Sequence, residues 1–258
     1  LRFEVPERIL ADGSIREPLD EAYVERLVRE LAGKGVEALA VAFLHSYRNP
    51  AHEQAVAQIV ARVAPHLRVA LSSEVAPELR EYERTSTTCA NVYVQALVER
   101  YLRDLEQRLA RQGFAGQFFV MLSSGGLATI DTAIRFPVRL LESGPAAGAL
   151  AAAYYGREAG LRDLLSFDMG GTTAKACLID DAEPLVAREF EVARADRFKR
   201  GSGLPIRVPV IELIEVGAGG GSIARVDRLG LLKVGPDSAG ADPGPACYGL
   251  GGRLPTVT

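Results

Sequence analysis

The feature that most constrains this chain is a polar, glycine-containing segment between two apolar runs. Leu164, Leu165 and Phe167 precede it, and the residues at 176–179, Ala-Cys-Leu-Ile, follow it. Short apolar runs on either side of a Gly-Gly pair predict two strands joined by a tight turn. The segment therefore predicts a central β-hairpin buried in a sheet, with its polar groups gathered in the loop.

Each residue of the loop suits contact with an anion. Gly170 and Gly171 carry no Cβ, so the backbone there can adopt positive φ and bring its N–H groups close to a phosphate. Thr172 and Thr173 add hydroxyl donors. These four residues are the predicted phosphate cradle.

Two charged residues flank the loop and extend this interpretation. Asp168 lies where the first strand ends and is predicted to hold a hydrated Mg²⁺, because Mg²⁺ keeps several waters and takes few protein carboxylates. Lys175 adds a positive point charge. An ordinary hairpin with a Gly-Gly turn is the alternative. The combination of groups favours a nucleotide site over it, although no Gly-x-x-x-x-Gly-Lys-Ser/Thr loop is present.

A second glycine-rich turn follows later in the chain, with four glycines among residues 217–221. Its core is Gly219, Gly220, Gly221 and Ser222, between apolar segments that read as strands. Bare backbone leaves room for a ligand surface, so this turn is predicted to contact the nucleotide. A flexible glycine hairpin is the alternative.

Two further turns are candidates for substrate contact. Ser124, Gly125 and Gly126 follow a predicted strand at 117–122, at the carboxyl end where open α/β sheets bind ligands; a plain strand-to-helix turn is the alternative. Ser143 is predicted to cap a helix of small residues that runs to about Tyr155, and the start of such a helix can face a phosphate.

The first part of the chain follows βαβ order. Helices are predicted at 20–32 and 50–64, and strands at 36–44 and 67–72. A long helix is predicted from about 85 to 112 with an apolar stripe. Arg84 and Thr85, at its start, either belong to a helix-start network or present polar groups to a substrate. We expect one α/β part over 1–160 and a second lobe over 161–258.

Composition excludes several classes of protein. The 258 residues carry a net charge of −3, which does not favour a nucleic-acid partner, and no apolar run is long enough to span a membrane. The three cysteines are far apart and form no Cys-x-x-Cys pair, which predicts a reducing cytoplasm. The chain starts at Leu1 and stops within an apparent strand, so we expect a segment of a longer polypeptide.

Six motifs in order give a more specific indication. They lie at residues 80–87, 124–126, 142–145, 168–173, 217–222 and 235–249. The loop alone resembles that of the actin-like ATPase superfamily, and the ordered set resembles the hydantoinase A/oxoprolinase family. The resemblance implies an α/β fold with an actin-like ATPase (ribonuclease H-like) core, a mixed sheet, βαβ units and the central hairpin.

The same resemblance implies an ATP-dependent hydrolase of cyclic amides of the hydantoin or 5-oxoproline type. ATP, with Mg²⁺, phosphorylates the substrate carbonyl oxygen in this family. By residue, it implies Asp168 as the group that positions the metal or water, Gly170–Thr173 as the phosphate cradle and Gly219–Ser222 as a second turn in contact with the nucleotide. Asp168, Thr172 and Lys175 are the predicted catalytic groups, with Asp168 as the predicted metal ligand. It also implies a hydantoinase B-type partner subunit, a homo-oligomer and a cytoplasmic enzyme.

Other functions are also consistent with the sequence. The motifs equally suit the ATP-using subunit of an acetone or acetophenone carboxylase, a sugar-kinase-like nucleotide-binding protein, or an assembly module that uses the long helix as an interface. Many relatives have an acidic residue where this chain has Lys175. The family's N-terminal domain, with its own Asp-x-Gly-Gly-Thr loop, is expected to lie outside this chain.

Overall fold

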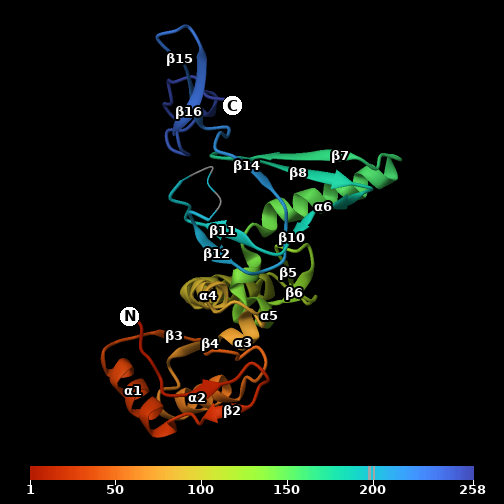
Figure 1. Cartoon of the computed structure of the whole chain (residues 1–258). Helices are drawn as coiled ribbons and strands as arrows, with labels where there is room; N and C mark the ends of the chain where they lie inside the picture. Colours follow the sequence, from red (N-terminus) through yellow and green to blue (C-terminus); the bar gives the residue numbers. More distant parts are fainter. Residues whose placement is uncertain (197–198, 200) are drawn as a thin grey trace. The chain divides into compact units, whose positions relative to one another are not determined.

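A computed structural model describes residues 1–196, 199 and 201–258 (Figure 1). Their contacts group them into two units. Unit 1 holds Leu1–Leu122, Gly126–Leu141 and Arg188–Pro209, and unit 2 holds Ser123–Gly125, Glu142–Ala187 and Val210–Thr258. The chain thus passes between the units more than once. The division of the chain into an α/β part over 1–160 and a second lobe over 161–258 stays a prediction.

Unit 1 combines helices with short strands. Its elements are β1 (Arg8–Ile9), β2 (Ile15–Glu17), α1 (Glu21–Gly33), β3 (Ala38–Val41), α2 (Ala51–Val63), β4 (Arg68–Leu71), α3 (Ser72–Val75), α4 (Glu81–Arg111), β5 (Phe119–Met121), β6 (Leu127–Thr129), α5 (Ile130–Arg135), a 3-10 turn (Pro137–Leu140), β11 (Phe190–Val192) and β12 (Leu204–Ile206).

The predicted βαβ unit is confirmed. Strands β3 and β4 pair in parallel, from Ala38 opposite Arg68 to Val41 opposite Leu71, and α2 is the crossover between them. The preceding helix α1 begins where the Asp20 carboxylate accepts a hydrogen bond from the Tyr23 N–H at 2.8 Å. Helices α1 and α2 and both strands share one apolar core.

The long helix α4 begins at Glu81, earlier than predicted, and its buried face is polar. The Thr87 and Thr88 hydroxyls donate to the carbonyls of Glu83 and Arg84, four residues earlier, at 2.7 and 2.8 Å. A hydroxyl that donates to the carbonyl four residues earlier is typical of a helix interior. The Ser/Thr cluster therefore lies inside the helix and does not cap its start. The predicted apolar stripe is less buried than expected, because Leu102 is its only fully buried member among the described residues and Leu97 and Tyr101 are exposed.

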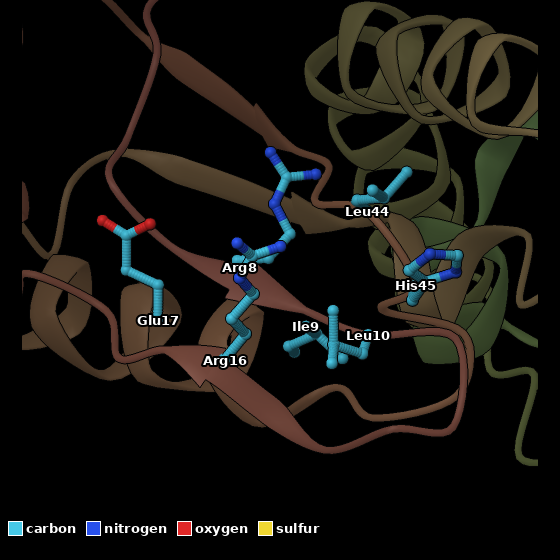
Figure 2. Close-up of a pocket in the computed structure, with 7 residues that line it drawn as sticks. All are labelled: Arg8, Ile9, Leu10, Arg16, Glu17, Leu44 and His45. Carbon is cyan, nitrogen blue, oxygen red and sulfur yellow. The ribbon is translucent and has the colours of Figure 1, made fainter.

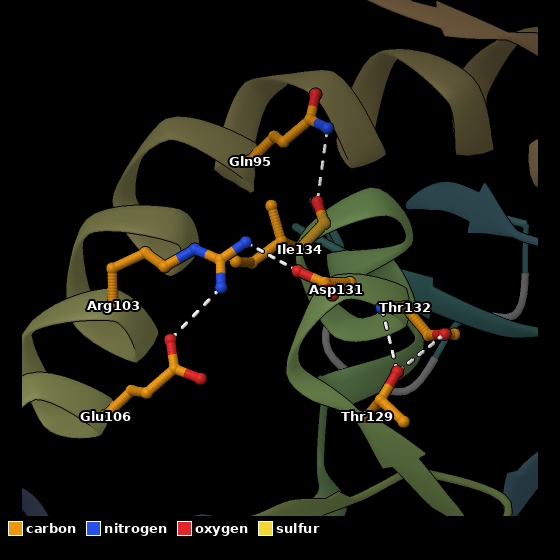
Figure 3. Close-up of polar contacts among 7 residues, drawn as sticks. All are labelled: Gln95, Arg103, Glu106, Thr129, Asp131, Thr132 and Ile134. Carbon is orange, nitrogen blue, oxygen red and sulfur yellow. Dashed lines mark hydrogen bonds and ion pairs between the residues drawn. The ribbon is translucent and has the colours of Figure 1, made fainter. Parts of the chain in front are cut away.

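Figure 3 shows how α5 is held against α4. The Arg103 guanidinium contacts the Asp131 carboxylate at 2.5 Å, and the Gln95 side-chain amide donates to the Ile134 carbonyl at 3.1 Å. Thr129 caps the start of α5, and Ile134 packs in the small apolar core between the two helices. This part of unit 1 is scaffold.

Unit 2 is a helix packed on a sheet, followed by a further hairpin. Its elements are α6 (Ser143–Glu158), β7 (Leu164–Met169), β8 (Ala174–Asp180), β9 (Glu183–Pro184), β10 (Val186–Ala187), β13 (Val210–Ile211), β14 (Ile214–Val216), β15 (Ser222–Val226), β16 (Leu232–Ser238) and a 3-10 turn (Ala246–Tyr248). The main sheet has the order β14-β8-β7, with β9 also paired to β8.

The predicted central hairpin is confirmed as β7 and β8, which pair antiparallel. Only one of its faces is buried, however. Cys177 lies in an apolar core with Ala146 and Ala149 of α6. On the opposite face Leu165 and Phe167 are 61% and 59% exposed. The prediction of two buried strands therefore holds for only one face of the hairpin among the described residues.

Three other predicted segments need correction. The apolar residues at 184–192 and at 208–216 each predict one continuous strand. Residues 184–192 are instead divided among β9, β10 and β11, which pair with β8, β13 and β12 respectively. The strand at 208–216 is divided into β13 and β14. The turn at 123–126 joins β5 and β6 as an antiparallel hairpin, so it is neither an open sheet end nor a strand-to-helix turn. No described helix is long and apolar enough to cross a membrane.

Candidate functional site

The hairpin loop (residues 170–173) is a closed four-residue turn between β7 and β8. The Gly170 N–H donates to the Thr173 carbonyl at 2.9 Å. The strands on either side continue this register, with Met169 opposite Ala174 and Asp168 opposite Lys175. The pairing of β7 and β8 therefore fixes where the loop begins and ends.

The second turn (residues 219–222) packs directly on the hairpin loop. Gly220 N–H donates to the Gly170 carbonyl at 2.9 Å, and Gly221 N–H donates to the Gly171 carbonyl at 2.8 Å. A Cβ at Gly219 would lie 2.6 Å from backbone atoms of Thr172 and Thr173, so only glycine permits this approach. The structure thus brings together the two glycine segments that were singled out in the sequence.

All backbone donors of the second turn are used within the chain. Besides the N–H groups of Gly220 and Gly221, the Gly219 N–H donates to Ser222 Oγ and the Ser222 N–H donates to the Gly219 carbonyl, each at 2.9 Å. Gly219, Gly221 and Ser222 are also buried. Direct contact of this turn with a nucleotide stays a prediction, and its N–H groups are already occupied.

In the hairpin loop, by contrast, most backbone N–H groups are unbonded. Within the described part of the chain, the N–H groups of Gly171, Thr172 and Thr173 and both threonine hydroxyls have no hydrogen-bond partner. Gly171 and Thr172 are exposed and Thr173 is half-buried. The carbonyls of Gly170 and Gly171 are taken by the second turn. What remains for a ligand is a set of clustered donors, which suits an anion.

Three charged residues lie at paired positions on adjacent strands, next to the loop. Asp168, Lys175 and Glu215 are direct cross-strand neighbours on β7, β8 and β14, so their side chains project from the same face of the sheet. The Lys175 ammonium pairs with the carboxylate of Glu142, which precedes α6. Asp168 is exposed and forms no ion pair with any described residue. Its carboxylate is therefore open to a cation.

The residues present fit a magnesium ion held together with phosphate oxygens. No group of three or more His, Cys, Asp or Glu is placed to hold a metal ion among the described residues. Mg²⁺ does not need such a cage, because it is usually bound by one or two carboxylates, waters and substrate phosphates. Asp168, one register position before the loop, is the residue placed for this role.

Glu142 was not singled out in the sequence, although it belongs to the Glu-Ser-Gly-Pro motif at 142–145. Its φ of +64° lies in the left-handed region, which is uncommon for a residue with a side chain. It occupies the position that was predicted for Ser143 as the helix cap, and Ser143 is instead the first residue of α6. No local pattern in the sequence indicates its pairing with Lys175, which lies 33 positions away.

The two predicted glycine residues at 125 and 126 fall in different units. The Ile211 N–H donates to the Ser123 carbonyl at 2.8 Å, which ties the segment Ser123–Gly125 to unit 2. Gly125 has φ +87°, and a Cβ there would lie 2.7 Å from Leu150 of α6. Ser124 is half-buried beside it, whereas Gly126 is exposed and belongs to unit 1. Substrate contact by this turn stays a prediction.

Arg84 and Thr85 lie on α4 in unit 1. Arg84 is 1% exposed. Its guanidinium donates to Ser72 Oγ at 3.0 Å, to the Glu78 carbonyl at 3.0 Å and to the Phe43 carbonyl at 2.5 Å. Arg84 thus bonds internally from each of its three nitrogens, and substrate contact by its side chain stays a prediction. Thr85 is exposed.

Cys177 lies two residues after Lys175 on β8, on the same face of the sheet, and packs in the apolar core against α6. Burial, with a smaller contribution from the negative charge of Glu212, raises the pKa of the Cys177 thiol above its usual value. Cys177 is 1% exposed, so it is a packing residue of the sheet against α6.

Comparison with known proteins places this geometry in context. Residues 84–258 match the sequence model described as hydantoinase/oxoprolinase, and residues 1–64 match that of the hydantoinase/oxoprolinase N-terminal region. At least part of that N-terminal region therefore lies in this chain, contrary to the expectation from the sequence.

Relatives and solved structures match along nearly the whole chain. An uncharacterised protein of Methanocaldococcus jannaschii is 48% identical, with 100% of this chain and 38% of the relative covered. Caprolactamase subunit alpha of Pseudomonas jessenii is 37% identical (100% and 36%), and the acetophenone carboxylase gamma subunit of Aromatoleum aromaticum is 36% identical (98% and 34%). The chain spans little more than a third of the length of these relatives.

Two solved structures share the fold. The ATP-dependent caprolactamase of Pseudomonas jessenii has a TM-score of 0.75 at 35% identity, with 98% of this chain and 36% of that chain covered. Nucleotide-free acetone carboxylase has a TM-score of 0.74 at 28% identity, with 98% and 35% covered. The predicted fold class, a mixed α/β actin-like ATPase core, is confirmed.

Proposed function

Because the chain belongs to the hydantoinase/oxoprolinase family, we propose that its hairpin loop binds the phosphates of ATP in an enzyme that opens cyclic amides. The observation that carries this proposal is the balance of hydrogen-bonding groups in the loop. The carbonyls of Gly170 and Gly171 are occupied by the second turn, while the N–H groups of Gly171, Thr172 and Thr173 are free among the described residues. A loop whose unbonded groups are mainly N–H and O–H donors is suited to phosphate oxygens.

The proposed chemistry begins with phosphoryl transfer from ATP to the carbonyl oxygen of the amide. This transfer makes the carbonyl carbon open to attack by water. Collapse of the adduct breaks the ring C–N bond, and the nitrogen leaves as an amine after it gains a proton. Hydrolysis of the acyl phosphate that remains then releases the carboxylate and inorganic phosphate. Catalysis of phosphoryl transfer is mainly positioning and electrostatic stabilisation. The loop N–H groups and the Thr172 hydroxyl would hold the phosphate oxygens, and Asp168 would orient metal-bound water. Mg²⁺, when bound, supplies neutralisation of phosphate charge.

Lys175 has a less direct place in this proposal. Its side chain is only 15% exposed and is paired with Glu142, so its charge is already offset. We assign it to holding the start of α6 beside β8 rather than to contact with the phosphate.

The test uses the full-length protein together with its partner subunit. ATP hydrolysis is measured with hydantoin, 5-oxoproline and caprolactam, in the wild type and in Asp168→Ala. We expect ATP hydrolysis that depends on one cyclic amide and is lost in Asp168→Ala. Amide-dependent hydrolysis that survives Asp168→Ala unchanged would contradict the role of this loop.

A carboxylase is the second candidate function, and a specific finding favours it. The acetophenone carboxylase gamma subunit and the acetone carboxylase structure match this chain about as well as caprolactamase does. The same loop would then serve phosphorylation of an enolate oxygen. ATP hydrolysis that requires acetone or acetophenone with bicarbonate, and none of the three cyclic amides, selects the carboxylase. Activity only on a hydroxyl substrate would instead indicate a sugar-kinase-like protein.

Partner subunits are also part of the proposal. Relatives are named as alpha and gamma subunits of their enzymes. We infer that the longer protein which contains this chain works with a second subunit of the hydantoinase B type, in a homo-oligomeric complex. Co-purification of the full-length protein with that subunit, followed by mass measurement of the complex, tests the inference. The cytoplasm remains the expected compartment, since the three cysteines are free.

A further inference from the structure

A hollow in unit 1 presents two arginines that form no ion pair with any described residue. Its volume is about 460 Å³, and it is formed by the β1–β2 hairpin together with the end of the segment that follows β3 (Figure 2). The lining residues are Arg8, Ile9, Leu10, Arg16, Glu17, Leu44 and His45. None of these residues belongs to the hairpin loop or the second turn, which lie in unit 2.

Arg8 lies on β1 and Arg16 lies on the adjacent strand β2. Figure 2 shows their side chains extending toward the same region of the hollow. Within the described part of the chain, neither guanidinium forms a hydrogen bond or an ion pair. Glu17 stands opposite Arg8 in the strand register and lines the same hollow, yet no ion pair joins them. Two like charges held near each other are unfavourable without an anion. The hollow therefore has an uncompensated positive charge.

The frame around the two arginines is fixed by buried contacts. Just before β1, Glu7 contacts His52 Nδ1 at 2.7 Å, and both side chains are less than 10% exposed. In the turn between β1 and β2, the Asn49 side-chain amide donates to the Gly13 carbonyl at 2.8 Å. Ile9 is fully buried and forms the floor. A ligand would meet a preorganised surface, which lowers the entropy cost of binding.

His45, on the wall of the hollow, has unusual features of its own. Its φ is +58°, a left-handed conformation that is costly for a residue with a side chain. Its Nδ1 atom is buried and has no hydrogen-bond partner among the described residues. Strained backbone of this kind is concentrated at functional sites in proteins.

We propose that this hollow binds an oxyanion, either a carboxylate or a phosphate group, between Arg8 and Arg16. Guanidinium groups match both ligands because their planar N–H donors pair with two oxygens at once. The apolar floor of Ile9 and the flanking Leu10 and Leu44 leave space for the organic part of a small anion. The site is separate from the proposed ATP loop and does not depend on it.

The test is a residue-resolved NMR titration of the 258-residue chain at constant ionic strength. Inorganic phosphate, acetate and chloride are added in separate series, and the arginine Nε and backbone amide signals are followed. We expect saturable shifts of Arg8, Arg16 and the β1–β2 amides with phosphate or acetate but not with chloride. The tighter of the two ligands identifies the phosphate or carboxylate class.

Variants make the test specific. Arg8→Gln and Arg16→Gln should each weaken binding at this hollow by about fivefold or more. Arg16→Lys, which keeps the positive charge but loses the planar guanidinium donors, should also weaken binding of the oxyanion. Arg29→Gln is the matched control, because Arg29 is a surface arginine already paired with Glu25 at 2.7 Å. Backbone amide spectra verify the fold of each variant.

Three results would overturn the proposal. These are shifts in chloride equal to those in phosphate, equal affinity in Arg8→Gln and in the wild type, or no saturable shift at the β1–β2 hairpin with either oxyanion. If the third result is found together with phosphate shifts at residues 171–173, the proposal for the hollow fails and the proposal for the hairpin loop stands. The two sites can therefore fail separately.

Discussion

The hairpin loop and the second turn have nearly the same composition but use their backbone differently. Both consist of glycines followed by hydroxyl residues, and they lie against each other in unit 2. The second turn directs its N–H groups into the protein: to Ser222 Oγ, to its own carbonyl at Gly219, and to the carbonyls of the loop. In the loop, the carbonyls of Gly170, Gly171 and Thr173 accept hydrogen bonds, while the N–H groups of residues 171–173 have no partner among the described residues.

This difference shows that residue type alone does not mark a binding site. What matters is which donors and acceptors remain after the fold has used the others. By this criterion Arg84 resembles the second turn in having its donors used within the protein, because its guanidinium is buried and bonded to protein atoms. Substitutions of groups that are used internally should lower stability. Substitutions in the loop should affect binding and leave stability nearly unchanged.

The largest expected effect on stability comes from Arg84→Met. We expect the free energy of unfolding to fall by about 3–5 kcal/mol, because one member of a buried charged network is removed. The network includes Ser72 and the fully buried Glu53, whose carboxylate accepts from the Ser72 hydroxyl at 2.6 Å. Urea unfolding measures the change. Arg29→Met, at an exposed ion pair, should cost less than about 1 kcal/mol, and equal losses in both variants would contradict the assignment.

The next effect concerns the contact between the two turns. Gly219→Ala places a methyl group 2.6 Å from the backbone of Thr172 and Thr173. We expect a loss of about 1–3 kcal/mol in the free energy of unfolding, typical of overpacking, because the loop must shift. Gly171→Ala is the matched control, since no atom lies within 4 Å of a Cβ there. If Gly219→Ala is as stable as Gly171→Ala, the two turns do not pack as described.

Thr172→Val should separate binding from stability. The Thr172 hydroxyl has no partner among the described residues, so its removal should change the free energy of unfolding by less than about 0.5 kcal/mol. Loss of one donor to the transferred phosphate should lower substrate-dependent ATP hydrolysis by the full-length protein about tenfold or more. Unchanged turnover in this variant would remove Thr172 from the proposed site.

The smallest effect is expected for Glu142→Gln. This substitution weakens the ion pair with Lys175, and the Glu142 side chain is 43% exposed. We therefore expect a loss of less than about 1 kcal/mol, which decreases further in high salt. Urea unfolding at low and high salt measures both. A loss that salt does not change would show that Glu142 acts through something other than its charge.

Much of the fold follows from local patterns in the sequence. The βαβ unit and the β7–β8 hairpin were predicted because apolar runs, glycines and the Asp20 cap lie close together in the chain. The errors arise where distant residues decide the outcome. Residues 184–192 read as one strand, but they divide because β9, β10 and β11 have three different partners. The polar face of α4 is buried only because segments far along the chain supply its hydrogen bonds, such as Arg207 N–H to Thr87 Oγ1 at 2.8 Å.

The candidate site was predictable in part for the same reason. Glycine and threonine in the hairpin loop indicated an anion cradle, and Asp168 followed from its place at the strand end. The sequence did not reveal that the second turn supports the loop, since that depends on bonds between residues about fifty positions apart. The pairing of Lys175 with Glu142 across 33 positions was likewise not visible.

The most direct test of this account is amide hydrogen exchange of the full-length protein with and without Mg·ATP. We predict fast exchange at Gly171, Thr172 and Thr173 without nucleotide, and protection there when Mg·ATP is bound. The N–H groups of residues 219–222 should be protected in both states, because they are bonded within the chain. Exchange at residues 171–173 that Mg·ATP leaves unchanged under saturating conditions would contradict the claim that this loop binds phosphate.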